Sequence, residues 1–120
     1  MSIPARTMFR GDSLRFAVTV TREGAPVDLT GGKMWMTAKR SPADADALAV
    51  FQVSSPADGI VITHADAGLA EITIPPAATN SLTAVTRLVY DIQLLEAVGL
   101  VTTLETGYLT VNVDVTRAGS

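Results

Sequence analysis

Residues 87–96 carry the sequence RLVYDIQLLE, and this stretch decides the fold class. Leu88, Tyr90, Ile92 and Leu94 occupy every second position in it. Successive side chains of a strand point to opposite sides, so this spacing indicates a strand with one buried face. We therefore predict that residues 87–96 form the longest strand of the protein.

The same alternation recurs before and after this stretch. It predicts further strands at residues 14–20, 33–39, 48–53, 60–63, 69–74, 100–104 and 108–115. Turn residues separate these segments, and Pro75-Pro76 ends one of them because proline lacks the N–H that a strand ladder needs. Residues 41–46 and 77–82 are expected to form at most short helical turns.

Seven to eight short strands with no long helix are typical of an antiparallel β-sandwich, so we predict an all-β, immunoglobulin-like fold. A closed barrel is the alternative. The chain has no cysteine, so the sandwich is expected to lack a disulfide. Its 120 residues suit one domain over 1–120, with loosely ordered arms at residues 1–9 and 117–120.

Composition excludes several classes of protein. The chain is 48% hydrophobic and 18% charged, which is too apolar for a disordered segment. Its net charge of −3 argues against nucleic acid as a partner. Residues 1–9 lack the apolar run of a secretory signal, and no stretch approaches the roughly 18 apolar residues of a membrane span. We therefore expect a protein made in a cytoplasm and no contact with a membrane.

The acidic and basic candidates for chemistry each fail a spacing test. Asp44 and Asp46 could begin a calcium loop, but the third ligand and the glycine of that pattern are missing. Asp91 and Glu96 are an odd number of residues apart, so regular alternation sends them to opposite faces and Asp91 to a solvated one. Gly31-Gly32-Lys33 lacks the earlier glycine of a phosphate-binding loop.

Nucleophilic catalysis has equally little support. His64 is the single histidine, and no serine lies in a G-x-S-x-G turn, so we interpret His64 as a turn residue. Arg10-Gly11-Asp12 spells a cell-adhesion tripeptide, but we interpret it as the turn that enters the first predicted strand. We expect no enzyme activity, no cofactor, no metal and no small-molecule substrate.

The only tryptophan is the most informative single residue. If Met34 and Met36 face the core, alternation turns Trp35 outward between Lys33 and Lys39. Tryptophan is enriched at the centres of protein interfaces, so these residues and Tyr108 are candidate interface residues. The alternative is that a bulge or a covering loop buries Trp35.

The order of the segments resembles a known module. The residues that carry the resemblance are RGDSLRF at 10–16, VTVTREGAPVDLTG at 18–31, WMTAK at 35–39, the hairpin between 59 and 76, YDIQL at 90–94 and TLETGYLTV at 103–111. Together they cover about residues 8 to 117. They are similar to the N-terminal immunoglobulin-like domain of phage baseplate upper proteins and to related short tail proteins of phages and prophages.

The resemblance implies a non-catalytic structural protein of a phage or prophage, located in the tail or baseplate of the virion. Its partners would be other phage structural proteins and further copies of itself in a homo-oligomer. The alternative from the residues is a small sandwich that binds carbohydrate or a cell-surface ligand. That alternative requires Trp35 and Tyr108 to share one exposed concave surface.

Overall fold

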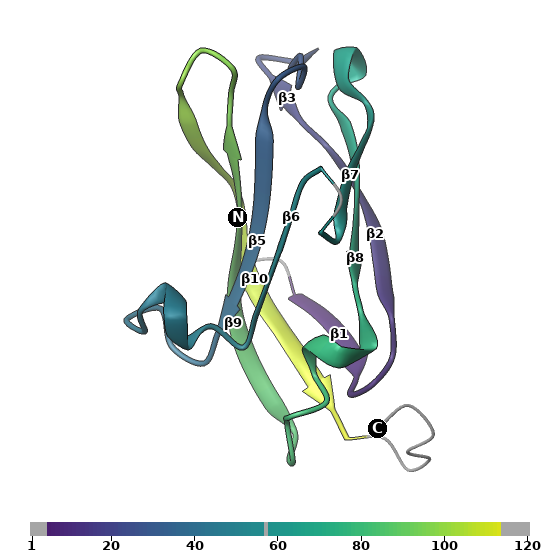
Figure 1. Ribbon diagram of the computed structural model, residues 1–120, viewed down its shortest axis with the longest axis vertical. Helices are drawn as coiled ribbons and strands as arrows, with labels where there is room; N and C mark the ends of the chain where they lie inside the picture. Colours follow the sequence, from purple (N-terminus) through teal and green to yellow (C-terminus); the bar gives the residue numbers. More distant parts are fainter. Residues whose placement is uncertain (1–4, 57, 114–120) are drawn as a thin grey trace.

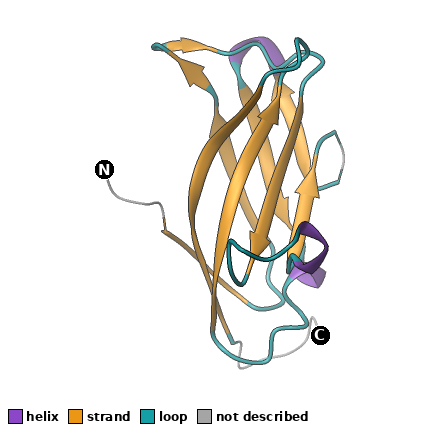
Figure 2. Ribbon diagram, turned by 90° about the vertical axis from the view of Figure 1, so that its left-hand side faces the viewer, coloured by secondary structure: helices purple, strands orange, loops and turns teal. Residues whose placement is uncertain are grey.

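The alternating stretches form the strands of two facing sheets in a computed structural model, which describes residues 5–56 and 58–113 (Figures 1 and 2). One sheet has the order β1-β10-β9-β5-β6. Its strands are β1 (Ala5–Phe9), β5 (Lys33–Lys39), β6 (Phe51–Ser54), β9 (Thr86–Leu95) and β10 (Val101–Asn112). The predicted strand at 87–96 is therefore present as β9, the central strand of this sheet.

The second sheet has the order β2-β8-β7 and covers the inner face of the first. Its strands are β2 (Leu14–Thr19), β7 (Ile60–His64) and β8 (Leu69–Ile74). A short ribbon of β3 (Thr21–Arg22) and β4 (Ala25–Pro26) follows β2. One isolated bridge, Ser54 to Gly59, links the edges of the two sheets among the described residues, so the chain forms a sandwich and not a closed barrel.

Neighbouring strands pair antiparallel except at one edge, where β1 runs parallel to β10. The prediction of an antiparallel β-sandwich is confirmed. The loosely ordered arm expected at residues 1–9 is a strand over Ala5–Phe9, because the strand β10 offers it an edge to pair with. Residues 1–4 and 117–120 lie outside the described residues.

Two local expectations are corrected. The two strands predicted at 100–104 and 108–115 are one strand, β10, with a bulge between Thr103 and Glu105, and residues 114 and 115 lie outside the described part. Residue 48, expected to begin a strand, ends the 3₁₀ turn η1 (Asp46–Leu48), and β6 begins at Phe51. The other 3₁₀ turns are η2 (Ala65–Ala67) and η3 (Pro76–Ala78).

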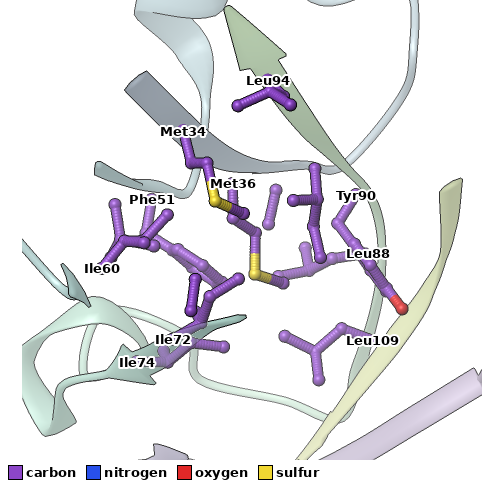
Figure 3. Close-up of a cluster of buried hydrophobic side chains, with 14 of the residues drawn as sticks. Met34, Met36, Phe51, Ile60, Ile72, Ile74, Leu88, Tyr90, Leu94 and Leu109 are labelled. Carbon is purple, nitrogen blue, oxygen red and sulfur yellow. The ribbon is translucent and has the colours of Figure 1, made fainter. Parts of the chain in front are cut away.

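The core lies between the sheets and draws on both (Figure 3). Met34 and Met36 of β5 are fully buried, as are the β9 residues predicted to face inward. Opposite them lie the isoleucines of β7 and β8, among them Ile72 at the centre of the second sheet. Burial of apolar surface between the sheets is the main favourable term in the stability of such a sandwich.

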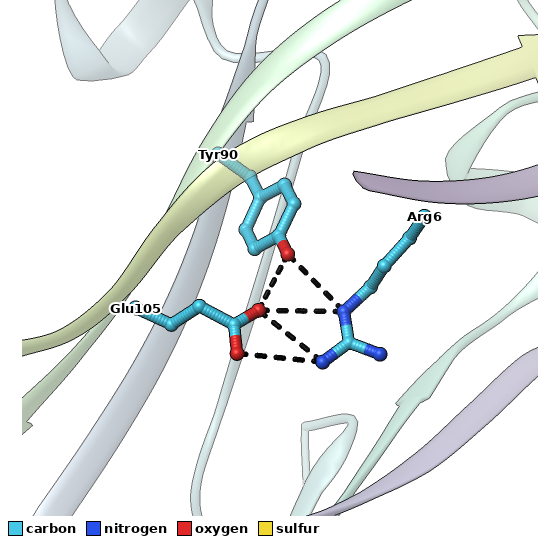
Figure 4. Close-up of polar contacts among 3 residues, drawn as sticks. All are labelled: Arg6, Tyr90 and Glu105. Atoms are coloured by element: carbon cyan, nitrogen blue, oxygen red, sulfur yellow. Dashed lines mark hydrogen bonds and ion pairs between the residues drawn. The ribbon is translucent and has the colours of Figure 1, made fainter. Parts of the chain in front are cut away.

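A polar cluster connects β1 to the neighbouring strands of its sheet (Figure 4). The Tyr90 hydroxyl donates a hydrogen bond to the Glu105 carboxylate over 2.5 Å, and the Arg6 guanidinium lies 3.2 Å from the same carboxylate. Arg6 Nε donates to the Tyr90 oxygen, and the Arg6 guanidinium stacks 3.9 Å from the Phe16 ring of β2. Burial and the bond to Glu105 raise the pKa of Tyr90 to about 12.

None of the described residues belongs to a helix with the length and apolar character that crossing a membrane requires.

Candidate functional site

The outer face of the five-stranded sheet is the candidate site. On β5 this face carries Lys33, Trp35, Thr37 and Lys39, because the alternate residues Met34, Met36 and Ala38 face the core. The predicted outward direction of Trp35 is confirmed. Its ring is half-buried and lies outside the core, with the Lys33 ammonium 5.3 Å from the ring centre.

The strand register brings side chains from four strands into rows across this face. Trp35 is paired with Gln93 of β9. In the next row Thr37 lies between Gln52 of β6 and Asp91 of β9. Asp91 is paired on its other side with Thr106 of β10.

These rows form the floor of a hollow of about 420 Å³. The hollow is lined by Trp35, Thr37, Lys39, Pro42, Asp46, Gln52, Val89, Tyr90, Asp91, Gln93, Val101 and Thr106. Pro42 and Asp46 of the loop that carries η1 and Val101 at the start of β10 line its ends. Figure 1 shows that this loop and the hairpin between β9 and β10 both project away from β2, β7 and β8. The site therefore has a sheet as its floor and a loop at each end.

Lys39 holds one of these loops in place. Its ammonium lies 2.7 Å from the Asp46 carboxylate and donates a hydrogen bond to the backbone oxygen of Asp44 over 2.9 Å. The Lys39 side chain is only 18% exposed, whereas that of Asp46 is 81% exposed. The positive charge of Lys39 is thus already matched by a carboxylate of the same hollow.

Asp91 is the charged group at the floor of the hollow. It is half-buried, and within the described part of the chain it forms no ion pair. Gln93 Nε2 donates a long hydrogen bond of 3.4 Å to its Oδ2 atom. Burial raises the pKa of the Asp91 carboxyl, Lys39 opposes this rise and Asp46 adds to it.

The four predicted interface residues all lie on this face, but the hollow brings together only two of them. Trp35 and Lys39 line it. Tyr108 is paired with Val89, beneath the Arg87 guanidinium, which lies 4.4 Å from its ring centre. By the register, Tyr108 is two strands and four residues away from Trp35, which is roughly 16 Å.

Sequence reasoning missed three residues of the floor: Asp91, Gln93 and Gln52. Asp91 lies on the face opposite Tyr90, as predicted, but it is half-buried in the floor of the hollow and not fully solvated. The alternation of side chains along the predicted strand does place Asp91 and Gln93 on the same face of that strand. Only the pairing of β9 with β5 shows that this is the face of Trp35.

The structure also places the Arg10-Gly11-Asp12 motif and His64, for which the sequence predicted turns. Arg10 is buried and donates a hydrogen bond to the backbone oxygen of Leu82 over 2.8 Å, and Gly11 adopts a φ of +79° in the predicted turn. His64 is exposed at the end of β7. The described residues contain no group of three or more histidine, aspartate or glutamate side chains suited to a metal ion.

Comparison with known proteins gives likeness of fold alone. No family model matches the chain, and no curated protein sequence matches it. The solved structure of the natural killer cell receptor NKp44 is similar, with a TM-score of 0.53 and 12% identity over 95% of this chain and 100% of that one. AggA, the major subunit of aggregative adherence fimbriae type I of Escherichia coli, gives a TM-score of 0.34 and 12% identity over 93% of this chain and 91% of AggA. At these identities the NKp44 match shows an immunoglobulin-like β-sandwich and nothing about function.

Proposed function

We propose that this chain is a non-catalytic structural module that works through protein–protein contacts made by the outer face of its five-stranded sheet. The observation that carries this proposal is the position of the only tryptophan, which lies outside the core in a hollow between two projecting loops. Tryptophan in a partly dry, concave setting is characteristic of the residues that dominate binding energy in interfaces.

The setting that we propose is a phage or prophage particle. Its support is the sequence resemblance to the immunoglobulin-like domain of phage baseplate upper proteins. In this setting the chain is a tail or baseplate component of the virion, and its partners are further copies of itself and other phage structural proteins. Such assemblies are built from repeated contacts between small rigid modules.

The virion setting is tested by mass spectrometry of particles purified from the phage, or from the induced lysogen, that encodes the chain. We expect peptides of this protein at an abundance comparable to those of the tail proteins. Particles that carry the tail proteins but lack this chain would contradict the proposal. Soluble proteins of the same lysate that belong to no particle serve as the control for contamination of the purified particles.

The contact face is tested by light scattering of the purified chain over a range of concentrations. We expect a discrete oligomer for the wild type and a monomer for Trp35→Glu, because the substitution places a charge in the hollow. Val61→Glu is the matched control, since Val61 is 51% exposed on β7 of the other sheet. An oligomer that survives Trp35→Glu would exclude this face as the self-contact.

The second candidate function is binding of a small saccharide in the same hollow. It is favoured by an aromatic ring beside a carboxylate and two amides, since sugars present both apolar faces and hydroxyls. This alternative requires Trp35 and Tyr108 to share one exposed concave surface. The requirement is met only in part, because both residues lie on the outer face but Tyr108 does not line the hollow.

A further inference from the structure

We propose that the hollow receives an arginine side chain of a protein partner, with the guanidinium beside Asp91 and against the ring of Trp35. This inference rests on the proposed function, because it names the chemistry that the partner presents to the same face. Some hydrogen-bonding groups of the hollow are already used by the protein itself, and others are open to a ligand.

One N–H of each side-chain amide in the hollow is used within it, and the second N–H of each is open to a ligand. Gln52 Nε2 donates to Thr37 Oγ1 over 2.9 Å, and Gln93 Nε2 donates to Asp91 Oδ2. The ammonium of Lys39 is engaged by Asp46 and by the backbone oxygen of Asp44. The Lys39 ammonium therefore already has acceptors, whereas within the described part of the chain no hydrogen bond engages the indole N–H of Trp35.

The acceptors are free. Within the described part of the chain, no hydrogen bond reaches the side-chain oxygen of Gln52 or of Gln93, and Asp91 receives only the long bond from Gln93. A ligand that brings donors can therefore bind these oxygens, and the charge of Asp91 favours a cationic donor. Phosphate and carboxylate ligands are disfavoured because they would meet the unpaired Asp91 charge.

Charge points in the same direction. The hollow is lined by one cation, Lys39, and by the carboxylates of Asp46 and Asp91, so it carries a net charge of −1 at neutral pH. Lys39 and Asp46 form an ion pair, whereas Asp91 forms none within the described part of the chain and is only partly compensated by Lys39. A half-buried carboxylate gains most from a cation that also shields it from solvent.

Geometry favours a guanidinium over an ammonium. A guanidinium is planar, carries five N–H donors and no acceptor, and stacks on aromatic rings. Asp91 and Gln93 are two residues apart on one strand, so their oxygens lie on the same face and within the reach of one fork. The Trp35 ring in the adjacent strand provides the flat apolar surface beside them.

The proposal is tested by NMR titration of the full chain with the blocked tripeptide Gly-Arg-Gly. The probes are the indole N–H of Trp35 and the side-chain amides of Gln52 and Gln93, which are the only tryptophan and the only glutamines of the chain. The matched ligand replaces arginine with citrulline, which has nearly the same shape and no charge. Methyl glucoside is the ligand that tests the saccharide alternative.

We expect saturable shifts of these three groups with the arginine peptide and none with citrulline or the glucoside. Asp91→Asn should weaken arginine binding by at least about tenfold, in line with the loss of a charged hydrogen bond. Asp66→Asn removes the same charge from an exposed position in η2 and should bind like the wild type.

Equal shifts with arginine and citrulline, no saturable shift with the arginine peptide, or saturation by the glucoside alone would each overturn the proposal. The comparison of the arginine and citrulline peptides uses the wild-type chain, so it tests the proposal even if Asp91→Asn fails to fold. The titration uses purified protein and is independent of the analysis of virions. A chain that binds arginine but is absent from virions refutes the proposed function only, and a virion component that does not bind it refutes this inference only.

Discussion

At the scale of single residues, the polar cluster at the β1 edge shows how a charged side chain can be stabilising inside a sandwich. Arg6 and Glu105 are each about three-quarters covered, at 29% and 25% exposed, and Tyr90 supplies the hydroxyl that joins them. A buried pair of this kind is stable only when its remaining hydrogen-bonding groups have partners. Here Phe16 covers the guanidinium and Tyr90 satisfies the carboxylate.

We predict that Tyr90 makes the stability of the protein sensitive to alkaline pH. The pKa of Tyr90 is raised from 10.0 to about 12 in the folded state, so its contribution is complete below pH 10 and is lost as the pH rises to about 12. The loss amounts to roughly 2 to 3 kcal/mol of unfolding free energy. Urea unfolding between pH 8 and pH 12 measures it.

Tyr90→Phe should lower the unfolding free energy at pH 8 by about 1 to 2 kcal/mol and flatten its decline between pH 10 and pH 12. Tyr108→Phe removes a phenol from the outer face and should keep the wild-type slope. A Tyr90→Phe variant that declines as steeply as the wild type would show that other groups cause the alkaline loss.

A second prediction at this scale concerns Gly68, the residue between η2 and β8. Its φ is +70°, and a Cβ placed on it would lie 2.5 Å from the backbone oxygen of Val20. Gly24 also has a positive φ, of +81°, but a Cβ there meets no atom within 4 Å. The two glycines therefore separate the cost of backbone conformation from the cost of a clash.

We expect Gly24→Ala to lower the unfolding free energy by about 1 kcal/mol and Gly68→Ala by at least about 3 kcal/mol. Chemical denaturation of the two variants measures the difference. Equal losses would mean that the backbone around Gly68 moves aside at little cost.

At the level of single elements, the strand β5 contributes one face to the core and the opposite face to the hollow. Its even residues, Met34 and Met36, enter the core, and its odd residues form part of the outer face. The register with β9 then fixes which residues accompany Trp35. A shift of the register by one residue would exchange the two surfaces, so the core and the hollow are determined together.

Met36→Ala and Thr37→Ala test this division on neighbouring residues of one strand. Met36 is fully buried, so its truncation should cost about 2 to 5 kcal/mol of unfolding free energy. Thr37 faces the hollow, and its truncation should cost less than about 1 kcal/mol. Thermal or urea denaturation measures the loss of unfolding free energy in each variant. A larger loss for Thr37→Ala than for Met36→Ala would mean that Thr37, and not Met36, faces the core.

At the scale of the whole molecule, the two sheets share one core. The buried cluster includes side chains of β5 and β9 from one sheet and of β7 and β8 from the other. Neither sheet can leave its partner without exposing that cluster to water. The outer face therefore rests on a rigid base, while its end loops can differ without disturbing the core.

We predict a single cooperative unfolding transition for the chain. Fluorescence of Trp35 reports on the outer face of one sheet, and far-ultraviolet circular dichroism reports on the strands of both. The two probes should give the same urea midpoint, because one core holds both sheets. Separate midpoints would show that the second sheet unfolds independently.

The alternation at residues 87–96 was sufficient to predict β9 and its buried face, because the side-chain period of a strand is a local property. The fold class followed from the recurrence of this alternation along the chain. The same reasoning turned Trp35 outward. It predicted two strands in place of β10 because Glu105 and Gly107 interrupt the apolar period, and the pairing with β9 overrides that interruption. The strand at Ala5–Phe9 was missed because it forms only beside β10.

The spacing of apolar residues was thus enough to predict which residues of each strand face inward and an all-β fold, with the closed barrel excluded only by the pairing of the strands. Only the tertiary structure decided that Asp91, Gln52 and Gln93 share a hollow with Trp35. Those residues lie on three strands that pair from distant parts of the chain, and residues of the flanking loops complete the lining of the hollow. Long-range register and loop placement depend on contacts that no local pattern encodes.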